Sequence, residues 1–228
     1  MKISIVGSGR VGAAVGFAVL NIVKPEELVL QDIVPGVAEG EALDLAGAAV
    51  QVSPSTVISG SDKLEIIESS DFIVVTAGLA RSSTMTREQL FEKNKSIIEG
   101  IAKVVPDISP KAYVFVATNP SSKIAEVFRK ASGFPKERVF VLGTETDTAR
   151  LRYLLGKELK KNPDKIKSFV FGEHGEKMQF EFKEEPKDRT AMEDAVRGFG
   201  AKVIGLKGYT AWGVAVEAAL AIKKFAKK

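Results

Sequence analysis

The sequence has no cysteine and only one histidine among its 228 residues. Without cysteine there can be no disulfide, no thiolate metal site and no thiol nucleophile. A single histidine also leaves too few nitrogen ligands for an ordinary zinc centre, so we expect no bound metal. These absences direct attention to the one histidine, His174.

Long apolar runs are also missing. The longest stretches, such as Val11–Val23, are interrupted by glycine or asparagine and fall short of the roughly 20 apolar residues that a membrane span needs. The first residues, Met-Lys-Ile-Ser-Ile-Val-Gly, lack a convincing cleavage site and are better explained as a strand. We therefore expect no membrane helix and a cytoplasmic protein.

The charge balance is only mildly basic, with a formal net charge of +4. Acidic residues are interspersed among the lysines, and the densest basic runs, 157–167 and 223–228, are better explained as solvated helix faces than as a nucleic-acid surface. Hydrophobic residues make up 45% and charged residues 27%, which is typical of folded domains. We expect no nucleic-acid partner.

Short apolar runs alternate with stretches of helical composition along the first part of the chain. The expected strands are 2–6, 28–30, 71–77, 113–118 and 139–142, and the expected helices between them are 11–22, 86–105 and 123–132. Such alternation predicts a parallel sheet with helices on both faces. Beyond Leu142 the texture changes to charged helices and two short strand-like runs, 168–171 and 179–183, so we expect a domain boundary there.

A glycine motif follows the first expected strand. Gly7, Gly9 and Gly12 precede the first helix, and Asp32 follows Gly12 by 20 residues at the end of the second strand. This context is typical of a dinucleotide site, where glycines permit a tight turn, close approach of the pyrophosphate and helix–strand packing. Asp32 can accept a hydrogen bond from a ribose 2′-hydroxyl and would repel a 2′-phosphate, which predicts NAD rather than NADP.

Polar residues follow the next two strands, at the sheet edge where open α/β sheets bind ligands. The loop at 76–87 carries Arg81 and Arg87, whose guanidinium groups can clamp a dianionic substrate through paired bonds. Asn119, in Thr-Asn-Pro, can fix a carboxamide or a substrate oxygen. The alternatives are that both arginines are surface residues and that Asn-Pro is an ordinary turn.

His174 lies in Gly-Glu-His-Gly, 27 residues after Asp147. The unperturbed pKa of histidine, roughly 6.5, suits a proton-transfer base, and a carboxylate on one ring nitrogen would hold the other toward a substrate hydroxyl. We therefore treat Asp147 and His174 as a candidate acid–base pair. A lone histidine between glycines can also be a loop residue without a chemical role.

Together and in this order, these motifs resemble the lactate and malate dehydrogenase family over nearly the whole chain. The motifs are G-S-G-R-V-G, the Ala-Gly loop with its two arginines, Thr-Asn-Pro, Asp-Thr-Ala-Arg-Leu-Arg and Gly-Glu-His-Gly. The resemblance implies that His174 is the proton acceptor and Asp147 its orienting partner. The substrate-binding and cofactor-binding side chains that it further implies are Arg150 on the 1-carboxylate, Arg87 on the C2 oxygen, Asn119 on nicotinamide and substrate, and Thr210 in the pocket wall.

Arg81 falls where this family selects its substrate, and an arginine there resembles a malate enzyme, since lactate enzymes carry an uncharged residue. A second substrate carboxylate buried without a cation would be costly, which agrees with that resemblance. We therefore expect an NAD-dependent oxidoreductase that interconverts malate and oxaloacetate, a tricarboxylic acid cycle reaction, and that forms a homo-oligomer. The alternatives are an NAD-binding protein with impaired turnover and a dehydrogenase of lactate or another 2-hydroxy acid.

The sequence departs from the family pattern in its second half. Family members normally continue past the helix that here reaches Lys228, and the segment Met178–Arg197 is shorter than usual. The expected fold class is therefore α/β, a Rossmann-type doubly wound parallel sheet followed by a reduced α+β substrate domain. We expect an NAD-binding domain at 1–142 and a shortened catalytic domain at 143–228, in which either Gln179–Lys183 forms a substitute strand or oligomerisation offsets the loss.

Overall fold

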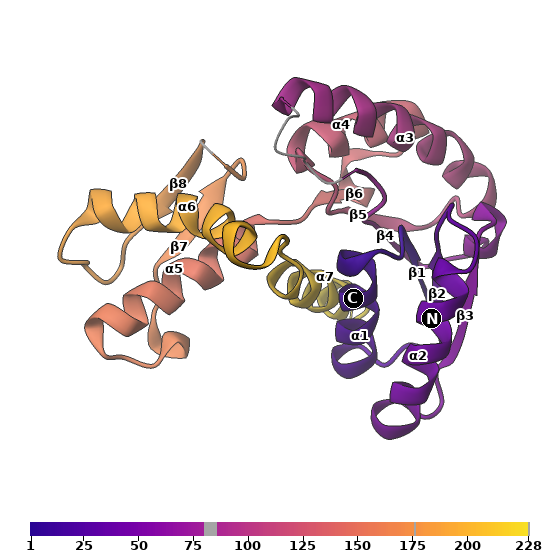
Figure 1. The fold of residues 1–228 in the computed structure, drawn as a ribbon, viewed down its shortest axis with the longest axis horizontal. Helices are drawn as coiled ribbons and strands as arrows, with labels where there is room; N and C mark the ends of the chain where they lie inside the picture. Colours follow the sequence, from indigo (N-terminus) through magenta and orange to yellow (C-terminus); the bar gives the residue numbers. More distant parts are fainter. Residues whose placement is uncertain (80–85, 176, 228) are drawn as a thin grey trace. The chain divides into compact units, whose positions relative to one another are not determined.

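The computed structural model describes residues 1–79, 86–175 and 177–227, apart from the side chain of Arg87. The chain divides into two compact units (Figure 1). The sheet unit comprises Met1–Leu142 and Val214–Lys228, and the small unit comprises Gly143–Gly213. In the described part of the chain, no helix is both long enough and apolar enough to cross a membrane.

The sheet unit is built on six parallel strands in the order β3-β2-β1-β4-β5-β6. The strands are β1 (Lys2–Val6), β2 (Glu27–Gln31), β3 (Val57–Ser61), β4 (Phe72–Val75), β5 (Tyr113–Val116) and β6 (Val139–Val141). The strand order reverses between β1 and β4, and such a switch point is where doubly wound sheets bind ligands. The predicted Rossmann-type sheet is confirmed.

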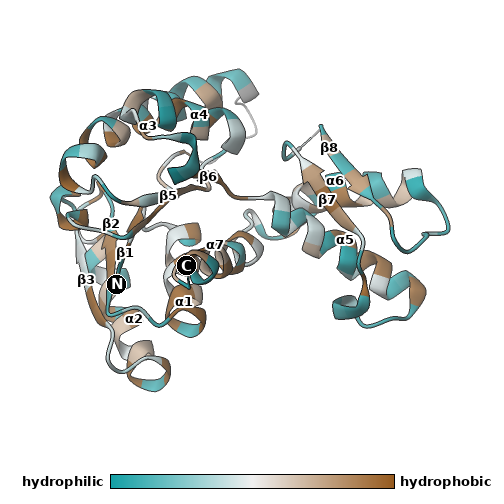
Figure 2. Ribbon diagram, turned by 180° about the vertical axis from the view of Figure 1, so that it is seen from behind, coloured by the Kyte–Doolittle hydropathy of each residue, from teal (hydrophilic) through white to brown (hydrophobic). Residues whose placement is uncertain are grey.

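Helices cover both faces of this sheet (Figure 1). They are α1 (Arg10–Ile22), α2 (Val37–Val52) and α7 (Trp212–Phe225) on one face and α3 (Arg87–Ile108) and α4 (Ser121–Ser132) on the other, with 3₁₀ turns η1 (Leu64–Ile67) and η2 (Lys136–Arg138). Successive strand side chains point to opposite faces of the sheet, and those of Val114 and Val116 pack with Ile98 of α3 and Ile124 of α4. Figure 2 shows hydrophobic colour along the strands and mixed colour on α3 and α4, as amphipathic helices require.

The last helix belongs to the sheet unit from Val214 onward, which differs from the expected second domain of 143–228. The reason is an aromatic cluster on the sheet. The ring of Phe225 lies 5.3 Å from Tyr113, 5.8 Å from Phe115 and 4.7 Å from Phe140, measured between centroids. Because these three residues sit on β5 and β6, burying Phe225 against them holds the end of α7 on the sheet.

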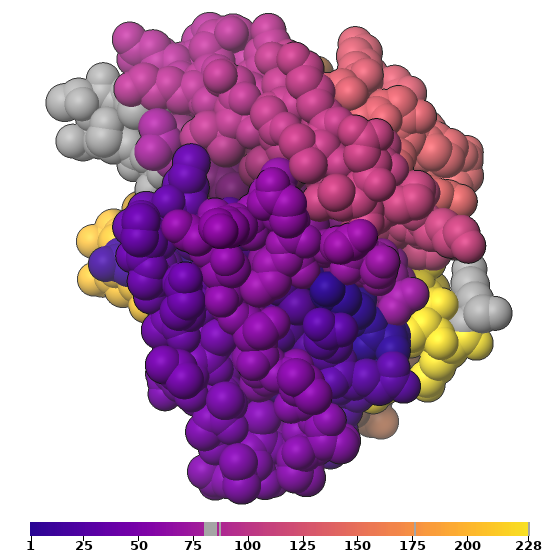
Figure 3. All heavy atoms as spheres, turned by 90° about the vertical axis from the view of Figure 1, so that its right-hand side faces the viewer, coloured from indigo at the N-terminus to yellow at the C-terminus, as the bar shows by residue number. Residues whose placement is uncertain are grey.

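The N-terminal residues lie beside the end of α7 on the surface of the sheet unit. Met1 and Ala226 line one shallow hollow, and in Figure 3 indigo N-terminal atoms lie next to yellow C-terminal atoms. The ammonium group of Met1 bonds the carboxylate of Glu26 and thereby lowers the pKa of that carboxyl. These contacts fix the amino edge of the sheet, opposite the edge where ligands are expected.

The small unit contains two long helices and one hairpin. Its elements are α5 (Thr144–Leu159), η3 (Pro163–Lys165), β7 (Phe169–Gly172), β8 (Met178–Glu181) and α6 (Arg189–Lys207). The strands pair antiparallel, with Val170 opposite Phe180, and Val170 packs with Leu151 of α5 and Val196 of α6. The strand expected from the alternation at 179–183 therefore forms, as β8, and its partner is β7.

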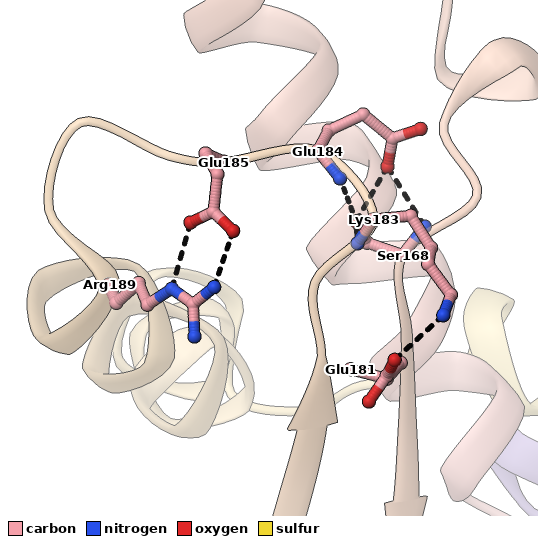
Figure 4. Close-up of polar contacts among 6 residues, drawn as sticks. All are labelled: Ser168, Glu181, Lys183, Glu184, Glu185 and Arg189. Atoms are coloured by element: carbon pink, nitrogen blue, oxygen red, sulfur yellow. Dashed lines mark hydrogen bonds and ion pairs between the residues drawn. The ribbon is translucent and has the colours of Figure 1, made fainter.

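A polar cluster ties the open end of this hairpin (Figure 4). The hydroxyl of Ser168 donates to Glu184 Oε2 at 2.6 Å and accepts from the backbone N–H of Lys183 at 3.0 Å. Glu184 also accepts from the backbone N–H groups of Lys167 and Ser168. Partial burial acts to raise the pKa of Glu184, but these hydrogen bonds outweigh it and the pKa lies below its ordinary value.

Candidate active site

Two of the three motif glycines leave no room for a side chain. Gly7 adopts a φ of +96°, and a Cβ there would lie 2.4 Å from the backbone nitrogen of Ala77. A Cβ on Gly12 would lie 2.0 Å from the carbonyl oxygen of Gly7. The loop is thus packed against both the segment after β4 and the start of α1, as a tight strand–turn–helix connection requires.

The third glycine faces open space. A Cβ on Gly9 would meet nothing within 4 Å, and Gly9 is the N-cap of α1 without a side-chain cap. The N-terminus of a helix presents unpaired N–H groups and a partial positive charge, which suit a phosphate. Asp32 lies beside this loop and accepts from the backbone N–H groups of Ser8 at 2.8 Å and Val34 at 3.0 Å. The cradle therefore fits the pyrophosphate and ribose of a dinucleotide.

The segment after β4 lies next to the glycine loop on one side and to the segment after β5 on the other. Thr76 donates to the carbonyl oxygen of Gly7 at 2.5 Å, and Thr118 donates to that of Ala77 at 2.7 Å. Asn119 directly follows Thr118 and is exposed at the carboxyl edge of the sheet. Asn119 thus lies where sequence reasoning expected it.

The two arginines of the first loop cannot be placed. Arg81 lies outside the described residues, and Arg87 begins α3 but its side chain lies outside them too. The helix start itself is well defined, because Thr86 and Gln89 form a capping box. The predicted arginine clamp stays a prediction.

In the small unit, two predicted side chains, His174 and Arg150, meet at the carboxylate of a third, Asp147. Asp147 Oδ2 lies 2.5 Å from His174 Nδ1, and Asp147 Oδ1 accepts from Arg150 Nη1 at 2.9 Å. The side chain of Asp147 is 1% exposed, whereas that of His174 is 31% exposed. An ionised carboxylate only accepts hydrogen bonds, so Nδ1 donates and Nε2 keeps the lone pair that a base needs.

A ladder of side-chain contacts holds α5 along β7. Three side chains spaced four residues apart on α5 contact the hairpin strand at positions spaced two residues apart. Thr144 contacts Gly172, Thr148 contacts Val170, and Arg152 contacts Ser168, which directly precedes β7. Thr148 Oγ1 accepts from the N–H of Val170 at 3.0 Å and donates to its carbonyl at 3.2 Å, and Arg152 donates to the carbonyl of Ser168 at 3.0 Å. Four helical residues rise about 6 Å and two strand residues about 6.6 Å, so the two repeats match. The ladder sets the position of Asp147 relative to the hairpin turn that carries His174.

Gly143, the N-cap of α5, lets the histidine ring lie close to that helix. Its φ is +134°, and a Cβ there would lie 3.3 Å from His174 Cγ. A side chain at this position would press on the ring and strain the backbone. The arrangement of the histidine therefore depends on a glycine that sequence reasoning did not single out.

Arg150 and Thr210 line one cavity of about 280 Å³ in the small unit. The guanidinium carbon of Arg150 lies 5.4 Å from the centre of the Phe199 ring, and Tyr153 meets that ring edge-on at 6.3 Å. A guanidinium over an aromatic face gains a cation–π contact that favours one orientation. The cavity can thus offer a fixed cation to a carboxylate ligand.

Comparison with known proteins gives a consistent result. Residues 1–141 match the family described as lactate/malate dehydrogenase, NAD binding domain. A malate dehydrogenase from Archaeoglobus fulgidus is 38% identical over 221 residues, which are 95% of this chain and 74% of that protein. The chain belongs to the lactate/malate dehydrogenase family.

Other relatives carry both names of the family. An L-lactate dehydrogenase from Clostridium botulinum is 41% identical over 175 residues, which are 77% of this chain and 54% of that protein. The solved structure of the Archaeoglobus fulgidus malate dehydrogenase in complex with NADH has a TM-score of 0.93 at 37% identity, and the match covers 100% of this chain and 78% of that one. The predicted family, its NAD cofactor and the enzyme class, an NAD-dependent dehydrogenase, are confirmed.

Sequence reasoning about this family member missed the residues that support the site. Phe199 contacts Arg150, Gly143 lies against His174 and Thr148 holds α5 to β7, but nothing local in the sequence marks these residues. Asn94 could have been noticed, because it stands in the apolar stripe of α3 between Leu90 and Ile98. Within the described residues, no group of three or more histidine, aspartate or glutamate side chains is arranged to hold a metal ion.

Proposed function

We propose that this chain interconverts malate and oxaloacetate with NAD. The observation that carries the proposal is the carboxylate of Asp147, which bonds His174 with one oxygen and Arg150 with the other. One buried anion thereby orients both a base and a carboxylate anchor. Both are needed close together at a 2-hydroxy acid, in which the carbon that bears the hydroxyl, C2, is bonded directly to the carboxylate carbon, C1.

The three residues that meet in the small unit have separate roles in the proposed reaction. His174 Nε2 takes the proton of the substrate hydroxyl on oxidation and returns it on reduction. Asp147 stabilises the imidazolium that forms, because its carboxylate is buried and already bonded to Nδ1. Arg150 pairs with the 1-carboxylate through donors that its single bond to Asp147 does not use. Bound NAD supplies the hydride acceptor for oxidation and, reduced, the hydride donor.

The remaining roles follow from the family resemblance. Arg87 polarises the C2 oxygen, Asn119 contacts nicotinamide and substrate, and Thr210 forms part of the pocket wall. Arg81 pairs with the second carboxylate of the substrate. Because an unpaired buried carboxylate would be costly, this last contact makes a dicarboxylate the preferred substrate.

Lactate, or another 2-hydroxy acid, is the second candidate substrate. The relatives that are 40–41% identical are named L-lactate dehydrogenases, which favours this reading. The distinction depends on Arg81, since a monocarboxylate offers no partner for that cation. The proposed preference for the dicarboxylate therefore depends on the single side chain of Arg81.

The test is a comparison of initial rates with oxaloacetate and pyruvate in the wild type and in Arg81→Gln. We expect the variant to lose roughly 100-fold in kcat/KM for oxaloacetate, about 3 kcal/mol, and to gain on pyruvate. If both substrates lose activity equally, Arg81 is a structural residue and the proposed selectivity is wrong. NADH binding without turnover in the wild type would instead support a cofactor-binding protein with impaired catalysis.

We also propose a cytoplasmic homo-oligomer that serves the tricarboxylic acid cycle. Support for association comes from α2, where Leu43 is 76% exposed and Val50, two turns later, is 72% exposed. Apolar side chains repeated on one helix face favour a protein contact. Light scattering should report a mass at least twice that of the chain, and Leu43→Lys with Val50→Lys should reduce it to the monomer.

A further inference from the structure

One amide interrupts the apolar stripe of α3. Leu90, Asn94 and Ile98 are spaced four residues apart and are 7%, 1% and 0% exposed, respectively. An amide buried without hydrogen-bond partners costs about 1–3 kcal/mol in proteins. Packing alone would therefore favour an apolar residue at position 94, and the asparagine must be explained by its polar contacts.

The Asn94 side chain bonds the backbones of two separate loops. Its Oδ1 accepts from the N–H of Leu79 at 2.8 Å, and its Nδ2 donates to the carbonyl of Asn119 at 2.8 Å. Leu79 lies after β4 and Asn119 after β5, the neighbouring strand. A single buried amide thus joins the carboxyl ends of two adjacent parallel strands.

The same two loops pack closely around the Asn94 amide. Gly78 adopts a φ of +152°, and a Cβ there would lie 2.6 Å from Thr118 Cγ2 and 3.0 Å from Asn94 Oδ1. Thr118 in turn donates to Ala77 across the same junction. Because the segments are in direct contact, a shift of either loop must displace Asn94 or break its bonds.

We propose that Asn94 is a positioning residue that sets substrate selectivity by fixing the backbones of Leu79 and Asn119 together. This inference rests on the proposed function, in which Asn119 contacts nicotinamide and substrate. It also uses the sequence, because Arg81 follows Leu79 by only two residues. Asn94 acts through these backbones and is not itself a catalytic residue.

The variant that tests this proposal is Asn94→Leu. Leucine has a similar size and suits the apolar stripe, but it removes both loop contacts. We expect a folded protein in which the Leu79 amide exchanges its hydrogen roughly tenfold faster and NADH binds roughly threefold more weakly. The ratio of kcat/KM for oxaloacetate over pyruvate should fall roughly tenfold.

Two further variants separate positioning from general stability. Ser109→Ala removes a buried tether at the other end of α3, where Ser109 Oγ donates to Ile67 at 2.7 Å and accepts from Ser70 at 3.1 Å. It should lower stability and leave the selectivity ratio unchanged. Asn94→Asp keeps the acceptor for Leu79 but places a carboxylate against the Asn119 carbonyl, so NADH binding should weaken while the Leu79 amide stays protected.

An Asn94→Leu protein with the wild-type selectivity ratio and the wild-type NADH Kd would overturn the proposal. An equal loss of selectivity in Ser109→Ala would overturn it as well, because the effect would then be one of stability. If the wild type turns over neither substrate, the proposed function fails separately. NADH Kd and Leu79 exchange then decide the inference alone, with both unchanged in Asn94→Leu counting against it.

Discussion

In the sheet unit the candidate cofactor site consists largely of glycine and backbone, whereas in the small unit the candidate catalytic site consists of ionisable side chains. Gly7 and Gly12 matter because an added atom would collide with neighbouring backbone. Asp147 and Arg150 matter because they form an ion pair, and His174 matters because its ring can accept a proton. The first site should therefore fail when an atom is added, and the second when a charge or a proton acceptor is removed.

The largest expected effect is on the small unit alone. His174→Asn keeps a polar side chain of similar reach but removes the base, so kcat for oxaloacetate reduction should fall roughly 10³-fold. NADH Kd should stay within a factor of two, because the glycine cradle lies in the other unit. Stopped-flow kinetics and fluorescence titration measure the two quantities separately, and a comparable loss in both would break the proposed division.

The next effect concerns the sheet unit, where two glycines should respond differently to alanine. Gly12→Ala forces a Cβ against the Gly7 carbonyl, so both the melting temperature and NADH affinity should drop, the latter by more than roughly tenfold. Gly9→Ala projects into open space and should weaken NADH binding with a much smaller loss of stability. Gly100→Ala, on α3 with nothing near its Cβ, is the matched control and should leave NADH binding unchanged.

The smallest effect concerns the hairpin that carries His174. Glu184→Gln weakens the bonds to Ser168 and Lys167 and should lower the local stability of β7 and β8 by about 1 kcal/mol. Because the folded pKa of Glu184 lies below its unfolded value, this contribution is present above the unfolded pKa and is lost as pH falls through the folded one. Hydrogen exchange of the β7 and β8 amides at pH 6 and at pH 3 measures it.

Glu185→Gln provides the control for that experiment. Glu185 pairs with Arg189 on the surface four residues away, and Figure 4 shows this pair beside the Ser168–Glu184 cluster. Exposed ion pairs contribute little to stability. Equal changes in the two variants would mean that the Ser168–Glu184 contacts have no special role in the hairpin.

The sequence predicted best what is encoded locally. The glycine cradle and Asp32 follow a fixed spacing around a strand and a helix start, and both form as expected. The strand at 179–183 was visible from its alternation. The helix expected at 86–105 continues to Ile108, with Pro106 inside it. A proline disfavours the interior of a helix, but the packing of Val105 in the core favours continuation of the helix here.

Contacts between distant residues could not be predicted in the same way. Strand β3 was missed because it is a partly exposed edge strand that lacks clear alternation, and α2 was missed because Gly40 and Gly47 interrupt it. The packing of the end of α7 on the sheet could not be foreseen either, since only the folded chain brings Phe225 to β5 and β6. The Thr148–Val170 and Asn94–Asn119 contacts likewise join residues more than 20 positions apart.

We propose that this chain catalyses NAD-dependent reduction of oxaloacetate in preference to pyruvate. The most direct measurement follows the consumption of NADH by the wild-type protein with each substrate in turn. We expect saturable turnover, with a kcat/KM for oxaloacetate at least roughly 100-fold above that for pyruvate. Turnover with pyruvate at an equal or greater kcat/KM, or NADH binding with no turnover of either substrate, would contradict it.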